Sequence, residues 1–156
     1  MNGNTGAVHE TPRYLLHLEA DKKQLSLLED FVGQHALALR LSQNVLYDML
    51  VAITEIVTNS IVHGYAGRPG AIDVEIWASG EALYARISDQ APVFDPTSVP
   101  APDTSLPLEK RPPGGMGIHV TRRFVDEMTH QAPPQGGNEL TLVRYHAIDL
   151  GAVGSG

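Results

Sequence analysis

The longest apolar pattern in the chain lies between Ser42 and Gly64. Its hydrophobic residues fall three and four positions apart, which is the spacing of a helix that buries much of its surface. Ser42 is a suitable N-cap, and Gly64 a suitable end. The buried side is expected to comprise Val45, Leu46, Met49, Leu50, Ile53, Ile56, Val57 and Ile61.

Two further helices are predicted from the same kind of spacing. The first follows Asp21, with Gln24 in the capping-box position, and ends at Leu39. Its apolar side is Leu25, Leu28, Phe31 and Val32. The second begins at Gly117 and ends at about Glu127. Its inward residues are expected to be Ile118, Val120, Thr121, Phe124 and Val125.

A period of two marks the strands. Apolar and polar residues alternate over 72–79 and 83–88, with Ser79-Gly80-Glu81 between them, which predicts a hairpin. Further strands are expected over 13–19, 128–132 and 140–145. Together these elements predict an α+β two-layer sandwich, with helices on one face of a mixed, mostly antiparallel sheet.

The segment between the hairpin and the last helix is rich in proline. Seven of the chain's 11 prolines fall within residues 92–113. A loop of this length is usually functional or disordered, and we interpret it as a lid. The rest of the chain reads as a flexible lead over 1–11, one domain over 12–148 and a flexible tail over 149–156.

The net charge and residue composition disfavour several classes of binding partner. The formal charge of -7 disfavours a nucleic-acid backbone or an anionic membrane as the main partner. The chain has no cysteine, no signal-peptide pattern and no apolar run expected to span a membrane, so a cytoplasmic protein is the default. Its seven histidines show no zinc-ligand spacing, and no zinc site is proposed.

Polar residues on the long helix are the first candidate site. Glu55, Asn59 and His63 fall four residues apart and therefore share one edge of that helix. Buried without partners, such side chains would cost several kcal/mol. Their partner could be a backbone group, or a metal ion with a phosphorylated ligand.

The second half of the chain adds two motifs. Asp89 ends a predicted strand, and Gly114-Gly115-Met116-Gly117-Ile118 precedes a predicted helix. With the Glu55 and Asn59 helix, this order resembles the Bergerat-type ATP-binding domain shared by histidine kinases, type II topoisomerases and heat-shock chaperones, the GHKL superfamily. The resemblance is greatest to the bacterial anti-sigma-factor serine/threonine kinases. It covers roughly residues 12–146 and includes His63-Gly64-Tyr65, Phe94-Asp95-Pro96 and Gly136-Gly137-Asn138.

The resemblance implies a role for each residue on the long helix. Asn59 would be the Mg²⁺ ligand, because Mg²⁺ takes one or two protein oxygens and the rest from phosphate and water. Glu55 would be the general base near the γ-phosphate of ATP. His63 would close the helix end or contact phosphate. The alternatives are an Asn59 bonded to a nearby loop and a solvated Glu55.

The resemblance also implies an adenine site and a phosphate cradle. Asp89 would accept a hydrogen bond from the adenine amino group, although it could simply initiate a turn before Pro92. Ala91 departs from the family, which usually has glycine there, and Asn138 stands where relatives often have threonine. Residues 114–118 would surround the phosphates with backbone amides at a helix start.

The function implied is that of an ATP- and Mg²⁺-dependent protein serine/threonine kinase. Its expected partners are a small anti-anti-sigma (STAS-type) protein and a sigma factor, and homodimer formation stays open. A nucleotide-gated binding module without phosphotransfer is the alternative, and Glu55 separates the two because a pure binder needs no base. A histidine-kinase catalytic domain is disfavoured because 156 residues leave little room for a phosphoacceptor hairpin.

Overall fold

The computed structural model describes residues 12–100, 105–110 and 115–149. Its sheet has five strands in the order β1-β2-β3-β5-β4. These are β1 (Tyr14–Glu19), β2 (Ala71–Ser79), β3 (Ala82–Asp89), β4 (Glu127–Gln131) and β5 (Asn138–Arg144). Every pair of neighbouring strands is antiparallel, so the described sheet contains none of the parallel pairing that a mixed sheet would have.

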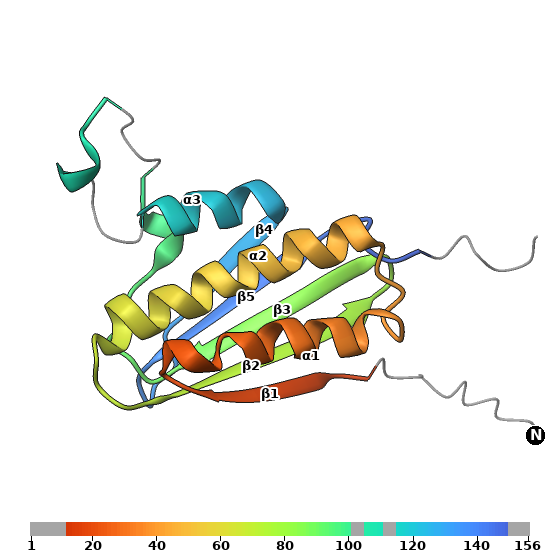
Figure 1. Ribbon diagram of the computed structural model, residues 1–156, viewed down its shortest axis with the longest axis horizontal. Coiled ribbons are helices and arrows are strands. Elements are labelled where there is room, and N and C mark those ends of the chain that lie inside the picture. Colours follow the sequence, from red (N-terminus) through yellow and green to blue (C-terminus); the bar gives the residue numbers. More distant parts are fainter. Residues whose placement is uncertain (1–11, 101–104, 111–114, 150–156) are drawn as a thin grey trace, which may run out of the picture.

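Three α-helices form the second layer, on one face of the sheet (Figure 1). They are α1 (Ser26–Ala36), α2 (Gln43–Asn59) and α3 (Gly115–Phe124). Short 3₁₀ turns occur at η1 (Lys22–Gln24), η3 (Pro96–Ser98) and η4 (Leu108–Lys110). The expected α+β two-layer sandwich is therefore confirmed.

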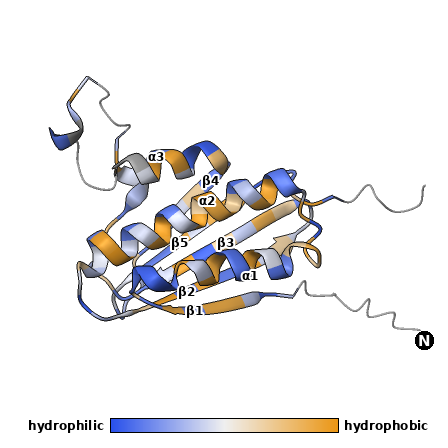
Figure 2. Cartoon of the chain, in the orientation of Figure 1, coloured by the Kyte–Doolittle hydropathy of each residue, from blue (hydrophilic) through white to orange (hydrophobic). Residues whose placement is uncertain are grey.

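The core lies between the two layers. Residues from alternate positions of β2, β3 and β5 meet the apolar sides of α1 and α2, while Figure 2 shows polar residues elsewhere around these helices. The fully buried side chains include Leu28, Val32, Met49, Ile53, Val57, Ile72, Val74, Ile76, Leu83 and Leu142. The apolar stripes expected on the first two helices are thus the buried ones.

The other face of the sheet is covered by none of the three α-helices. It carries Trp77 stacked on Tyr84, with ring centroids 5.3 Å apart, and the Arg13 guanidinium 4.2 Å from the Trp77 ring. Glu75 accepts from Arg13 at 2.7 Å and from Arg86 at 3.1 Å. This face combines aromatic rings with paired charges.

The long helix is apolar enough to resemble a membrane span. By length and composition alone the helical segment Gln43–Tyr65 qualifies. Length and composition alone are weak evidence for a membrane span, so the expectation that no apolar run spans a membrane stays a prediction. The core helix of a soluble protein meets the same criterion, and this helix packs its apolar side into the core described above.

Candidate functional site

A change of helix type at the end of α2 builds the first wall of the site. α2 continues into a π-helical segment, η2 (Ser60–Tyr65), and ends at Ala66 in the left-handed conformation with φ 52°. The Ser60 N–H meets the carbonyls of both Ile56 and Val57. Such π segments are rare and frequently lie at functional sites. The wider turn begins at Ser60, one residue after Asn59.

A cavity of about 260 Å³ lies between this segment and the sheet. One wall comes from α2 and η2, the other from β3, β5 and the loop after Asp89. Its lining is mostly apolar, with a few polar groups, which is typical of ligand pockets. The lining residues are Ile56, Asn59, Ser60, His63, Gly64, Ile87, Asp89, Ala91, Pro92, Val93, Phe94, Pro96, Ile118, His130, Asn138 and Leu140.

Asp89 is held from both sides at the end of β3. The Ser60 hydroxyl donates to Asp89 Oδ2. Asp89 Oδ1 accepts from the backbone N–H of Ala91 at 3.1 Å and from Asn138 Nδ2 at 2.9 Å. The carboxylate is therefore fixed in orientation at the cavity wall.

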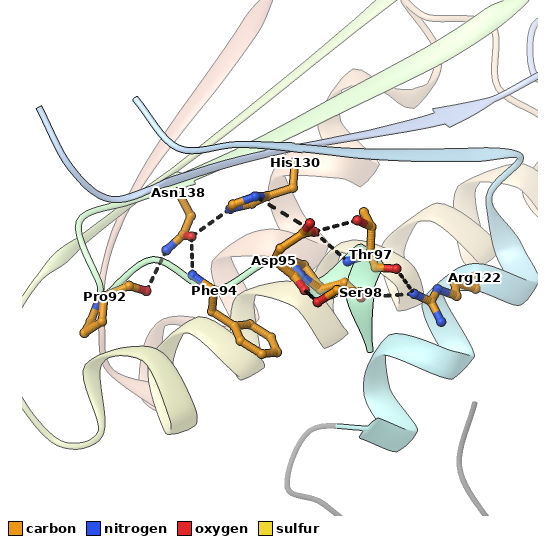
Figure 3. A network of polar contacts seen from close by, with 9 residues as sticks. Pro92, Phe94, Asp95, Thr97, Ser98, Arg122, His130 and Asn138 are labelled. Atoms are coloured by element: carbon orange, nitrogen blue, oxygen red, sulfur yellow. Dashed lines mark hydrogen bonds and ion pairs between the residues drawn. The ribbon is translucent and has the colours of Figure 1, made fainter. Parts of the chain in front are cut away.

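Asn138, the first residue of β5, joins four segments (Figure 3). Its Nδ2 donates to Asp89 at 2.9 Å. Figure 3 shows the same nitrogen donating to the carbonyl of Pro92, at 3.1 Å. Its Oδ1 accepts from the Phe94 N–H and from His130 Nε2, each at 2.8 Å. Both ends of the amide are thus bonded to the protein.

Gly137 allows this close approach of β5 to Asp89. A Cβ at Gly137 would collide with the backbone carbonyl of Asp89, and its φ is +85°. Only glycine adopts that conformation without strain. Gly137, directly before Asn138, therefore has a steric role next to the site, whereas a Cβ at Gly136 would meet nothing within 4 Å.

Tyr65 supports the loop from behind. Its hydroxyl donates to the Ala71 carbonyl at 2.6 Å and accepts from the Gln90 N–H at 2.7 Å. Burial raises the pKa of this hydroxyl. Tyr65 consequently stays a neutral donor at ordinary pH and fixes the backbone directly after Asp89.

Glu55 and Asn59 meet Gly117 in the first turn of α3. A Cβ at Gly117 would lie 2.6 Å from Glu55 Oε2 and 3.7 Å from Asn59 Oδ1. The positive end of a helix favours an anion there. Thr121, fully buried on α3, has its hydroxyl 3.3 Å from the Ala52 carbonyl and so ties α3 to α2.

The chemistry of this corner fits Mg²⁺ and phosphate. An amide oxygen and a carboxylate lie beside a helix start, which is a donor set that Mg²⁺ with phosphate accepts. Among the described residues no cluster of three His, Asp or Glu side chains could bind a metal by itself. Phosphate and water would therefore supply the remaining ligands.

The loop after Asp89 is fastened to α3. Arg122 donates to the carbonyl of Thr97 at 2.7 Å (Figure 3). It also donates to the carbonyl of Val99 at 2.7 Å. The Asp95 carboxylate caps the turn by accepting from Thr97, and this hydrogen bond is the main reason that its pKa lies below the ordinary value. The described part of the loop therefore has a defined conformation beside the cavity.

The departure at Ala91 is accommodated by Gly64. Ala91 is 3% exposed, and a Cβ added at Gly64 would lie 2.9 Å from the Ala91 Cβ. The close packing of the two segments therefore requires small residues at both Ala91 and Gly64. Ala91 narrows the wall at a point where the opposite residue has no side chain.

Most of the predicted site residues come together. Asn59, His63, Asp89, Ala91, Ile118 and Asn138 line the cavity. Glu55 and Gly117 face one another beside it and are not among its lining residues. Gly115 and Met116 begin α3, whereas Gly114 lies outside the described residues.

Ser60 and His130 were not predicted as site residues. Ser60 directly follows Asn59, begins the π segment and donates to Asp89. His130 lies on the edge strand β4, where its side chain is 7% exposed. The signal for His130 was its place two residues after Met128, on the inward face of a short strand.

Comparison with known proteins finds relatives that are named as anti-sigma factors and as a serine/threonine-protein kinase. The chain is 29% identical to an anti-sigma F factor of Thermoanaerobacter sp. (strain X514) over 103 residues, covering 65% of this chain and 71% of the relative. It is 27% identical to the serine/threonine-protein kinase BtrW of Bordetella bronchiseptica over 113 residues, covering 72% and 79%. These relatives agree with the resemblance stated from the motifs.

A solved structure shares the fold. The RsbU and RsbW domains of Rv1364c from Mycobacterium tuberculosis match with a TM-score of 0.58 at 16% identity, over 86% of this chain. This chain spans only 32% of that one. The histidine kinase-like ATPase domain family matches residues 18–144, which include Glu55, Asn59, Asp89 and Asn138. The chain therefore belongs to the family of histidine kinase-like ATPase domains.

Proposed function

We propose that this chain is an ATP-dependent protein serine/threonine kinase and anti-sigma-type regulator. The observation that carries the proposal is the meeting of Glu55 and Asn59 at the first turn of α3, beside the cavity that contains Asp89. A general base (Glu55), a metal ligand (Asn59) and a carboxylate that recognises adenine (Asp89) would then lie along one site. The names of the relatives support the same activity.

Each residue has a distinct task in this proposal. Asp89 accepts a hydrogen bond from an adenine amino group in the cavity. Asn59 supplies an oxygen ligand, and the backbone at the start of α3 faces the phosphates. Bound Mg²⁺ and ATP supply the charge neutralisation and the transferable phosphoryl group. Glu55 orients the partner's hydroxyl and takes its proton.

The proposed protein substrate is a small anti-anti-sigma protein of the STAS type, and the second proposed partner is a sigma factor. A phosphoryl acceptor must approach Glu55 from outside the cavity, because Glu55 lies beside its lining and not within it. We further propose a cytoplasmic location and Mg²⁺ as the metal. The formal charge of -7 agrees with partners that are not nucleic acid.

The test separates transfer from binding. The protein is incubated with labelled ATP, Mg²⁺ and candidate anti-anti-sigma proteins, and phosphorylated partner is measured together with nucleotide affinity. Glu55→Gln should leave affinity largely intact and lower transfer by about 10²–10⁴-fold. Asn59→Ala should weaken Mg²⁺-dependent binding itself, because it removes a metal ligand.

Asp48→Asn is the matched control. Asp48 is the other carboxylate of α2, and it pairs with Arg144 at 3.1 Å, away from the cavity. This variant should keep both binding and transfer. If Glu55→Gln phosphorylates its partner at the wild-type rate, the kinase mechanism is wrong, and a nucleotide-gated binding module becomes the better interpretation.

A further inference from the structure

His130 lines the cavity but is used neither by the family motifs nor by the proposed chemistry. Its side chain is nearly buried and lies on the edge strand β4. Its Nδ1 lies 3.9 Å from Asp95 Oδ1, and its Nε2 lies 2.8 Å from Asn138 Oδ1. His130 therefore faces the amide that holds Asp89.

The hydrogen-bond partners of Asn138 identify which end of its side-chain amide is the oxygen and which is the NH₂ group. One end faces the Asp89 carboxylate and the Pro92 carbonyl, which are acceptors only, so it must be the NH₂ group. The other end accepts from the Phe94 N–H. His130 must then carry a proton on Nε2 to donate to the same oxygen, which fixes its tautomer at that nitrogen.

We propose that His130 and Asn138 form a positioning pair that sets the base selectivity of the nucleotide site. His130 holds the Asn138 amide, and that amide holds both Asp89 and the backbone from Pro92 to Phe94. This inference rests on the proposed function, because it assigns the selectivity of the same cavity. Asn138 acts here through Asp89 and not as a ligand of the base.

The pair can affect selectivity because most acceptor sites of the Asp89 carboxylate are already occupied by protein donors. A carboxylate offers about four acceptor sites. Ser60, Ala91 and Asn138 occupy three of them, two on Oδ1 and one on Oδ2. Among the described residues no further donor reaches Asp89, so the remaining site, on Oδ2, is the acceptor left for a ligand in the cavity.

A single fixed acceptor discriminates between purines. Adenine presents an amino donor at its six-position, whereas guanine presents a carbonyl acceptor there. The carboxylate therefore bonds adenine and repels guanine only while it keeps its orientation. Loss of the Asn138 donor frees Asp89 Oδ1 to rotate toward the cavity, and the penalty against guanine falls.

The experiment measures the ratio of GTP to ATP dissociation constants by calorimetry with Mg²⁺, on the full chain. Asn138→Asp keeps the shape but places an oxygen against Asp89, and His130→Leu removes the donor to Asn138. Each should lower the ratio by about tenfold, the effect of one lost hydrogen bond in a buried network. His130→Gln can again present an N–H and should keep most of the wild-type ratio.

Thr129→Ala is the control on the same strand, since Thr129 is exposed and lies beside His130. It should leave the ratio unchanged. The pair is overturned if His130→Leu and Asn138→Asp keep the ratio within twofold of wild type, whatever happens to their melting temperatures. The same holds if His130→Gln loses as much as His130→Leu. If the wild-type protein binds no adenine nucleotide, the proposed function is overturned together with the pair. This failure is distinguishable from failure of the pair alone, because the wild-type protein shows it without any variant.

Discussion

At the scale of single residues, Gly117 shows how one missing side chain leaves room for the proposed base. A Cβ at this position would meet the end of the Glu55 side chain, which can move aside, and not a rigid backbone. Gly117→Ala should therefore displace the Glu55 carboxylate without unfolding the protein. We expect phosphotransfer to fall by about 10²-fold, the effect typical of a misplaced catalytic group, with little change in melting temperature.

Gly33→Ala is the matched control for Gly117→Ala. Gly33 lies within α1, and a Cβ there meets nothing within 4 Å. Both substitutions replace a helical glycine by alanine, and this replacement stabilises a helix by up to about 1 kcal/mol. Only the change at Gly117 should affect transfer. Equal transfer by the two variants would show that Glu55 is not held against α3.

A second residue-scale prediction concerns His17 on the edge strand β1. The hydrogen bond that His17 Nδ1 donates to Asp73 Oδ1, at 2.7 Å, and then the contact with Glu19 raise the pKa of His17 above its ordinary value of 6.5. Its folded-state pKa is raised, so its contribution to stability is fully present below about pH 6.5. The contribution is lost as the pH rises through the folded pKa.

Titration followed by NMR checks this directly. The His17 ring signals should titrate above 6.5 in the wild type, and Asp73→Asn should bring the midpoint down, because it removes the first cause of the shift. A His17 midpoint that ignores Asp73→Asn would contradict the prediction.

The sequence singled out Glu55, Asn59 and Asp89 through their motif order and the family resemblance. In the structure Asn59 and Asp89 line the cavity and Glu55 lies beside it, and the roles assigned to the three residues stay predictions. Ser60 and His130 were not predictable in the same way. The alternation of β4 puts His130 on the same face as Met128, but the pattern does not show which strand lies next to it. The contact of His130 with Asn138, like that of Ser60 with Asp89, depends on long-range packing.

At the scale of elements, the start of α2 depends on one hydroxyl. Ser42 Oγ accepts from the Val45 N–H at 3.2 Å, as its N-cap position predicted. Ser42→Ala should destabilise the protein by about 1 kcal/mol, the usual cost of a lost N-cap. Chemical denaturation measures this as a lower midpoint with an unchanged slope. Ser42→Asp can cap the same turn and should restore the midpoint.

Element boundaries differ from the sequence-based expectations for identifiable reasons. The first helix begins with a 3₁₀ turn, and Gln24 Oε1 accepts from the Glu19 N–H and not from Asp21. The last helix ends at Phe124, because the Asp126 N–H bonds the Val143 carbonyl at 2.8 Å and the chain enters β4 at Glu127. Long-range pairing, and not local propensity, ends that helix.

At the scale of the whole molecule, the order of strands could not be inferred from the chain. β5 lies between β3 and β4, and pairs Asp89 with Asn138 at the end of its register. Alternation predicts that a strand exists but not its neighbour. The contact between Asp89 and Asn138, on which the proposed selectivity depends, is a product of that topology.

Nucleotide binding should stabilise the whole fold, because the cavity joins both layers. A ligand at 100 times its dissociation constant adds about 2.7 kcal/mol to the free energy of unfolding. ATP with Mg²⁺ should thus raise the melting temperature by several degrees, and GTP at the same concentration should raise it less. Scanning calorimetry with both nucleotides, with EDTA as the metal control, tests this. Equal shifts from the two would remove Asp89 as the adenine-reading residue.

The aromatic stack on the open face of the sheet gives the molecule a built-in optical probe. Trp77 is the only tryptophan in the chain, and it lies among Tyr84, Arg13 and Arg86 on the face opposite the helices. Its emission reports the polarity of that face alone. Nucleotide entering between the two layers should leave the fluorescence nearly constant, whereas a protein docking onto the open sheet should change it. The unlabelled chain can therefore distinguish ligand entry from protein docking on that face in a single cuvette.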